Sequence, residues 1–83
     1  MTTQTLSKDW NLLNQIQVVA EDYGVKDAVV YPYSQLIEIN YHEIGQGSVL
    51  SDLITDKMDK IAPDRSHRIK MIPSDKKLIV ELL

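Results

Sequence analysis

The sequence predicts an α+β fold: a two-layer sandwich in which a four-stranded, mainly antiparallel sheet carries two helices on one face. Two stretches have apolar residues at steps of three and four, which is the spacing of a helix that buries one side. Each is followed by two short runs rich in Val, Ile, Leu and Tyr with turn residues between them, the pattern of a hairpin. The order αββαββ fits one domain of 83 residues, 43% of them hydrophobic, with a single core.

The first helix is predicted over residues 8–23, where apolar side chains recur along one side. Ser7 is expected to be its N-cap, because a hydroxyl there can accept a hydrogen bond from a free backbone amide of the first turn. Gly24 follows the last apolar residue and suits the left-handed conformation in which many helices end.

The first hairpin is predicted from strands at residues 28–31 and 35–42, with Pro32 beginning the turn between them. In the second strand Ile37 alternates with polar neighbours such as Glu38, so one face is apolar and the other is polar. The apolar face is expected to lie against the helices.

The second αββ unit repeats this order. Its helix is predicted over residues 49–61, with Ser48 as N-cap and Pro63 after its end. A second hairpin follows, with strands predicted at residues 67–72 and 77–82. The two units, residues 6–44 and 47–83, are similar enough in pattern to suggest a pseudo-repeat, although shared turn and strand preferences would produce the same similarity.

The sequence Gly45-Gln46-Gly47-Ser48 lies between the second strand and the second helix, which is where phosphate-binding loops occur. Leu50 stands where a dinucleotide-binding fingerprint has its third glycine, and Glu43 would repel a phosphate. We therefore interpret these residues as a flexible connector and hinge between the two units, with glycine supplying any positive φ angle.

One face of the sheet is expected to remain uncovered by helices. Its predicted residues are Glu38, Asn40, His42, Arg68, Lys70, Ile79 and Glu81, with Leu36 or Ile72 nearby. Mixed charge beside an isoleucine is compatible with solvent or with a second copy of the sheet.

Charge is distributed unevenly along the chain, whose net charge is −3. Residues 1–46 contain two Lys or Arg against six Asp or Glu, whereas residues 47–83 contain seven against six. A basic edge is predicted in the second unit, formed by Arg65, Arg68, Lys70, Lys76 and Lys77. This edge supports an alternative function as a nucleic-acid-associated protein, while the interleaved carboxylates favour an ordinary solvated surface.

The residues contain few of the groups that catalysis or metal binding uses. Cysteine is absent, which fits a reducing cytoplasm, and no serine lies in a nucleophile motif. His42 and Glu43 are adjacent, so on a strand their side chains would point to opposite faces, and His67 has no carboxylate cluster beside it. We expect no enzyme, no metal, no cofactor and no membrane segment.

Three tyrosines gather around the first hairpin. Tyr41 is expected in the core, whereas Tyr31 and Tyr33 flank Pro32, and Tyr33 in particular suits a contact surface because tyrosine buries much area at low entropic cost.

These observations predict a small, non-catalytic protein-binding module in the cytoplasm that acts as a homodimer: a regulatory, adaptor or inhibitor protein, a group that includes compact proteins carried by mobile elements. A chain this short gains stability from an oligomeric interface. The partner-binding residues are predicted to be Tyr31, Tyr33, Glu38, Asn40, His42, Arg68 and Lys70.

Overall fold

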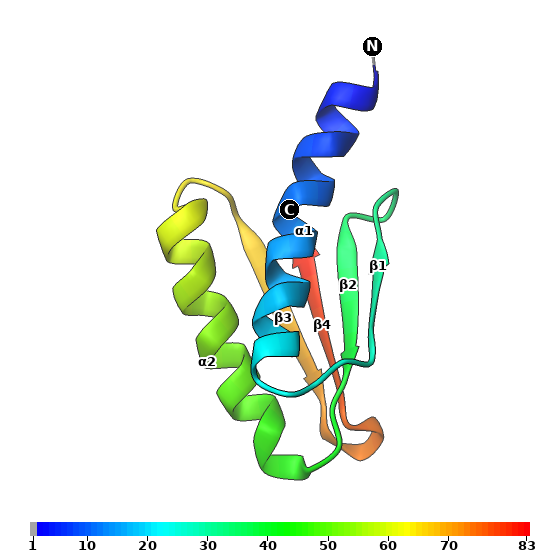
Figure 1. Ribbon diagram of the computed structural model, residues 1–83, viewed down its shortest axis with the longest axis vertical. Helices are drawn as coiled ribbons and strands as arrows, with labels where there is room; N and C mark the ends of the chain where they lie inside the picture. Colours follow the sequence, from blue (N-terminus) through cyan, green and yellow to red (C-terminus); the bar gives the residue numbers. More distant parts are fainter. Residues whose placement is uncertain (1) are drawn as a thin grey trace.

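The computed structural model describes the backbone of residues 2–83 and the side chains of residues 10–83. Its elements are α1 (Thr2–Asp22), β1 (Ala28–Tyr31), β2 (Leu36–Asn40), α2 (Ile44–Ile61), β3 (His67–Ile72) and β4 (Lys77–Leu82), with a 3₁₀ turn at Pro73–Asp75. The predicted αββαββ order and α+β fold are confirmed, and both helices pack on one face of an antiparallel sheet (Figure 1).

The sheet has the strand order β1-β2-β4-β3, and each neighbouring pair is antiparallel. The central strands β2 and β4 therefore come from different αββ units, and each unit also contributes one edge strand. Figure 1 shows α1 lying along the sheet and continuing past its end toward the N-terminus.

The core lies between the sheet and the helices. Every second residue of β2 and β4 is buried, as the alternation of apolar residues predicts. The buried side chains are Leu13, Ile16, Ala20, Val25, Ile37, Ile39, Tyr41, Leu50, Ile54, Met58, Leu78, Val80 and Leu82. Each fully buried Leu or Ile contributes roughly 1.5–3 kcal/mol relative to an exposed one.

Helix α1 ends as predicted but begins earlier. Gly24 has φ of 103°, its amide donates to the carbonyl of Glu21 and the amide of Val25 donates to the carbonyl of Ala20, which together form a Schellman motif. The prediction that Ser7 is the N-cap is wrong, since the helix already begins at Thr2. No glycine or proline interrupts residues 2–7, so the helical hydrogen bonding continues through them.

Strand β2 is shorter than the predicted range of 35–42. Gln35 has φ of 57° and closes the turn, so the strand starts one residue later. His42 does not lie on the sheet, contrary to the prediction, because its amide donates to the side chain of Gln46 at 2.8 Å as the chain turns into α2. Its side chain is therefore absent from the uncovered face of the sheet.

Helix α2 begins at Ile44, five residues before the predicted start, so the interpretation of residues 45–48 as a connector and hinge is wrong. Glu43 is the N-cap and Gln46 completes a capping box, with Gln46 Oε1 accepting from the amide of Glu43 at 3.0 Å. Ser48 therefore lies inside the helix and is not its N-cap. The glycines occupy the first two turns of α2.

Gly47 is needed because the ring of Tyr41 lies against it. A Cβ at Gly47 would approach Cζ and Oη of Tyr41 to 2.7 Å, whereas a Cβ at Gly45 would have no atom within 4 Å. Gly47 thus lets the first turns of α2 pack closely on the residue that follows β2.

We predict opposite effects for alanine at these two glycines. Gly47→Ala should lower the free energy of unfolding by about 1–3 kcal/mol, because the added methyl group overpacks the contact with Tyr41. Gly45→Ala is the matched control and should raise it by up to ~1 kcal/mol through helix propensity. Urea denaturation of both variants measures the difference, and equal stabilities would contradict the role of the Tyr41 contact.

A second prediction concerns Tyr41 itself, which is 4% exposed and whose Oη has no hydrogen-bond partner among the described residues. A buried hydroxyl without a partner costs about 1–3 kcal/mol, so Tyr41→Phe should leave stability unchanged or raise it. Thermal unfolding would test this, and a clear loss of stability would mean that the hydroxyl is hydrogen-bonded in solution.

Candidate functional site

The face of the sheet opposite the helices is the candidate site. Ile37 and Ile39 point toward the helices and are fully buried, so their neighbours on β2 point the other way. The strand register extends this face across all four strands. We define the open sheet face as Val29, Tyr31, Leu36, Glu38, Asn40, Arg68, Lys70, Ile72, Lys77, Ile79 and Glu81.

The side of this face formed by β1 and β2 is largely apolar. Tyr31 lies directly opposite Leu36, and Val29 lies two residues before Tyr31 on the edge strand. Val29 and Tyr31 are 45% and 41% exposed, and Leu36 is half-buried. Such a group on an uncovered sheet is typical of a contact surface, because it can bury further apolar area against a partner.

The charged residues of the open sheet face are mostly paired across strands. Arg68 Nη2 and Nε donate to the same carboxylate oxygen, Glu81 Oε1, at 2.8 and 3.2 Å. Lys77 Nζ lies 3.5 Å from Glu38 Oε1. Each exposed pair is worth about 0–1 kcal/mol, so the main effect is to fix the positions of the charges.

The structure brings together most of the predicted partner-binding residues. The open sheet face contains Tyr31, Glu38, Asn40, Arg68 and Lys70. Tyr33 lies outside it in the β1–β2 turn, where it is 88% exposed, and His42 lies in the bend before α2. Val29 was not predicted, because a second strand beginning at residue 35 would pair it with Ile37, whereas the observed start at Leu36 pairs it with Glu38.

The predicted basic edge is spread along the second hairpin. Arg65 precedes β3 and its Nε donates to the carbonyl of Leu83 at 3.3 Å, while Lys76 occupies the β3–β4 turn with φ of 51°. Arg68 and Lys77 are each paired with a carboxylate. Two of the five cations are thus paired with carboxylates, which lowers the positive charge available to a phosphate backbone.

The N-terminus of α2 is occupied by the protein's own side chains. Gln46 Oε1 accepts from the amides of His42 and Glu43 at 2.8 and 3.0 Å, and the Glu43 carboxylate takes part in the same capping box. A carboxylate at this position provides the negative charge that the helix dipole favours. An incoming phosphate would have to displace it.

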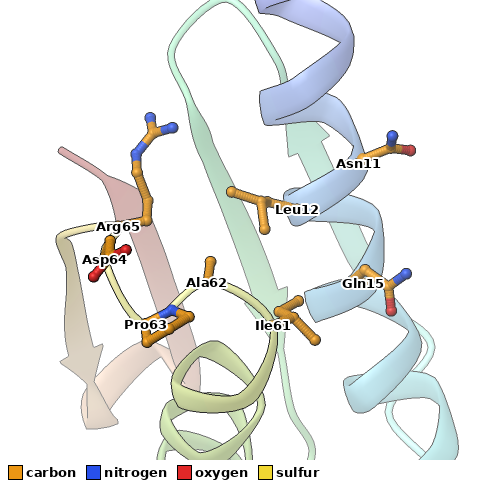
Figure 2. A pocket seen from close by; sticks show the side chains of 8 residues that line it. All are labelled: Asn11, Leu12, Gln15, Ile61, Ala62, Pro63, Asp64 and Arg65. Carbon is orange, nitrogen blue, oxygen red and sulfur yellow. The ribbon is translucent and has the colours of Figure 1, made fainter.

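An open cleft of about 690 Å³ lies between α1 and the end of α2. Figure 2 shows Leu12 of α1 projecting toward the loop that follows α2, with Ile61 between the two helices. The complete lining is Asn11, Leu12, Gln15, Ile61, Ala62, Pro63, Asp64 and Arg65. The lining consists of aliphatic side chains, two side-chain amides and the charged residues Asp64 and Arg65. These side chains do not place a nucleophile beside a general base.

The described residues contain no group of three or more His, Cys, Asp or Glu side chains that could hold a metal ion. Neither helix has the length and apolar character that a membrane span requires over the part of the chain described.

Comparison of the chain with protein-family models, curated proteins and solved structures finds no match. The surfaces of this molecule are therefore the basis on which its function is proposed.

We predict weak, salt-sensitive coupling between Arg68 and Glu81, because both side chains are partly exposed. A double-mutant cycle with Arg68→Ala and Glu81→Ala should give about 0.2–1 kcal/mol at low salt and less in 0.5 M NaCl. Urea denaturation provides the four free energies. A coupling that salt does not change would contradict the exposed ion pair.

Proposed function

We propose that this protein is a small non-catalytic binding module that contacts another protein through its open sheet face, in a regulatory, adaptor or inhibitory role. The observation that carries the proposal is the apolar group of Val29, Tyr31 and Leu36 on the face that no helix covers. In a domain this small, apolar residues that could have joined the core lie at the surface instead.

The chemistry of the face is suited to protein recognition. Tyr31 combines a large apolar ring with a polar hydroxyl, the kind of side chain that often dominates binding energy. Arg68 and Glu81, held together at 2.8 Å, lie in the same cross-strand row as Tyr31 and Leu36. A partner would thus meet an apolar group on one side of the face with fixed charges beside it, and such charges contribute specificity and association rate.

Self-association through the same face is part of the proposal. The open sheet face has eleven residues, whereas a stable interface of standard size has roughly 20–30 residues on each side. A homodimer formed through this face alone is therefore expected to be weak and concentration-dependent.

The same observations favour protein binding over the nucleic-acid alternative. A phosphate track needs free cations along one surface, whereas Arg68 and Lys77 are paired with carboxylates of neighbouring strands. Protein partners tolerate such mixed charge.

The proposal is tested by affinity capture from an extract of the native host with a matched pair of variants. Tyr31→Ser removes a 41% exposed ring from the open sheet face, and Val18→Ser removes a 47% exposed side chain from α1. We expect Tyr31→Ser to weaken binding of a captured partner at least about tenfold, because a buried Tyr anchor is typically worth 2 kcal/mol or more. Val18→Ser should bind as the wild type does.

A partner that binds both variants equally, or that Val18→Ser alone loses, would contradict the proposal. Sedimentation of the free protein over a range of concentrations tests self-association separately. A dimer that Tyr31→Ser does not weaken would place the dimer interface elsewhere.

A further inference from the structure

The two edges of the sheet differ in how they are protected. β1 has four residues and is followed by Pro32, and the side-chain amide of Gln17 on α1 donates to the carbonyl of Ala28 at 3.4 Å. β3 has six residues and forms the other edge. An unprotected edge strand presents a row of backbone groups to which another strand can bind.

The register shows which backbone groups of β3 face outward. The amide of Leu83 donates to the carbonyl of Ser66, its direct partner, so this is a hydrogen-bonded pair. Hydrogen-bonded and non-hydrogen-bonded pairs alternate along two antiparallel strands, so the backbone groups of Arg68, Lys70 and Ile72 bond to β4. The backbone groups of the alternate residues face outward. These are His67, Ile69 and Met71, whose amides and carbonyls point away from β4.

A second copy of the chain is a poor occupant of this edge. Two β3 strands related by a two-fold axis must pair antiparallel with like faces aligned. Centring the pair on Ile69 puts Arg68 of one copy opposite Lys70 of the other, and centring it on Lys70 puts the two Lys70 side chains opposite each other. Both of these registers, which overlap most, place like charges directly across the new pair and are destabilised.

The side chains of β3 select a different occupant. On the open sheet face Lys70 would attract carboxylates, because it has no ion pair among the described residues, whereas Arg68 is already paired with Glu81. On the helix side Met71 is 38% exposed and Ile69 is half-buried, so both can bury apolar side chains. A strand that alternates acidic and apolar residues matches both faces at once.

We infer that the β3 edge binds an extended segment of another protein, with alternating apolar and acidic residues, as a fifth strand of the sheet. The inference rests on the proposed function as a protein-binding module and names the chemistry of the partner. The outward groups of His67, Ile69 and Met71 supply the hydrogen bonds, and Lys70 supplies the preference for acidic residues.

The test uses an eight-residue peptide of alternating valine and glutamate, with a second peptide in which lysine replaces each glutamate. The protein is the full chain, labelled with ¹⁵N, and binding is followed by the chemical shifts of its backbone amides. We expect the acidic peptide to shift the amides of His67, Ile69 and Met71, and the basic peptide to bind at least about tenfold more weakly.

Strand addition is distinguished from simple charge attraction by N-methylated peptides. In an added strand every second peptide amide faces β3 and the others face solvent. N-methylation of the set that faces β3, either all valines or all glutamates, should abolish binding, and N-methylation of the other set should have little effect. Because these changes are made in the peptide, they do not alter the folding of the protein. Binding that survives both sets of methyl groups would overturn the inference.

The charge preference is tested with a matched pair of protein variants. Lys70→Glu should weaken the acidic peptide about tenfold and strengthen the basic one, because it reverses the charge beside the added strand. Lys60→Glu, in the last turn of α2, makes the same change of charge away from the sheet and should alter affinity less than twofold. Equal effects of the two variants would overturn the inference.

Three further results would overturn it: no shifts at millimolar acidic peptide, shifts confined to the open sheet face, or shifts of the β3 amides with protein concentration alone, which would indicate pairing of two copies. The Tyr31→Ser variant separates this inference from the proposed function. If Tyr31→Ser leaves both peptide binding and partner capture intact, the edge site is retained and the open sheet face is excluded as the contact with the partner.

Discussion

The antiparallel pairing of β2 with β4 is the constraint on which the rest of the structure depends. It joins the two αββ units through their central strands, and the alternating residues Ile37, Ile39, Leu78 and Val80 are fully buried beneath the helices. The same alternation directs Glu38 and the other intervening residues to the open sheet face. It also leaves β1 and β3 as edges, so both candidate contact surfaces follow from one pairing.

The half of the sheet formed by β1 and β2 differs in chemistry from the half formed by β4 and β3, because each half comes from a different αββ unit. The β1 side has an apolar group around Tyr31 and an edge that Gln17 partly covers. The β3 side has cations and a longer edge strand of six residues. The ion pair of Lys77 with Glu38 lies between these regions and that of Arg68 with Glu81 lies within the β3 side, and both hold their charges in place at little net gain in stability. One partner could contact both regions, because they share the same sheet.

Much of this arrangement was predictable from local patterns, and the errors have specific causes. The ranges of β1, β3 and β4 follow directly from alternating apolar residues bounded by turn residues. The start of α2 was missed because Gly45 and Gly47 resemble a turn, whereas Gly47 is required by the ring of Tyr41, a contact that depends on tertiary structure. The spacing of Glu43 and Gln46 did contain the capping signal, but glutamate is an unusual N-cap. The unprotected edge could not be inferred, because strand order is set by packing between the two units.

The central claim is that a partner covers the open sheet face. Chemical modification of lysines in the captured complex and in the free protein tests it most directly, since Lys70 lies on this face and Lys60 lies on α2. The account predicts that the partner protects Lys70 from modification and leaves Lys60 as reactive as in the free protein. Protection of Lys60 with full reactivity of Lys70 would contradict it, because the partner would then lie on the helices.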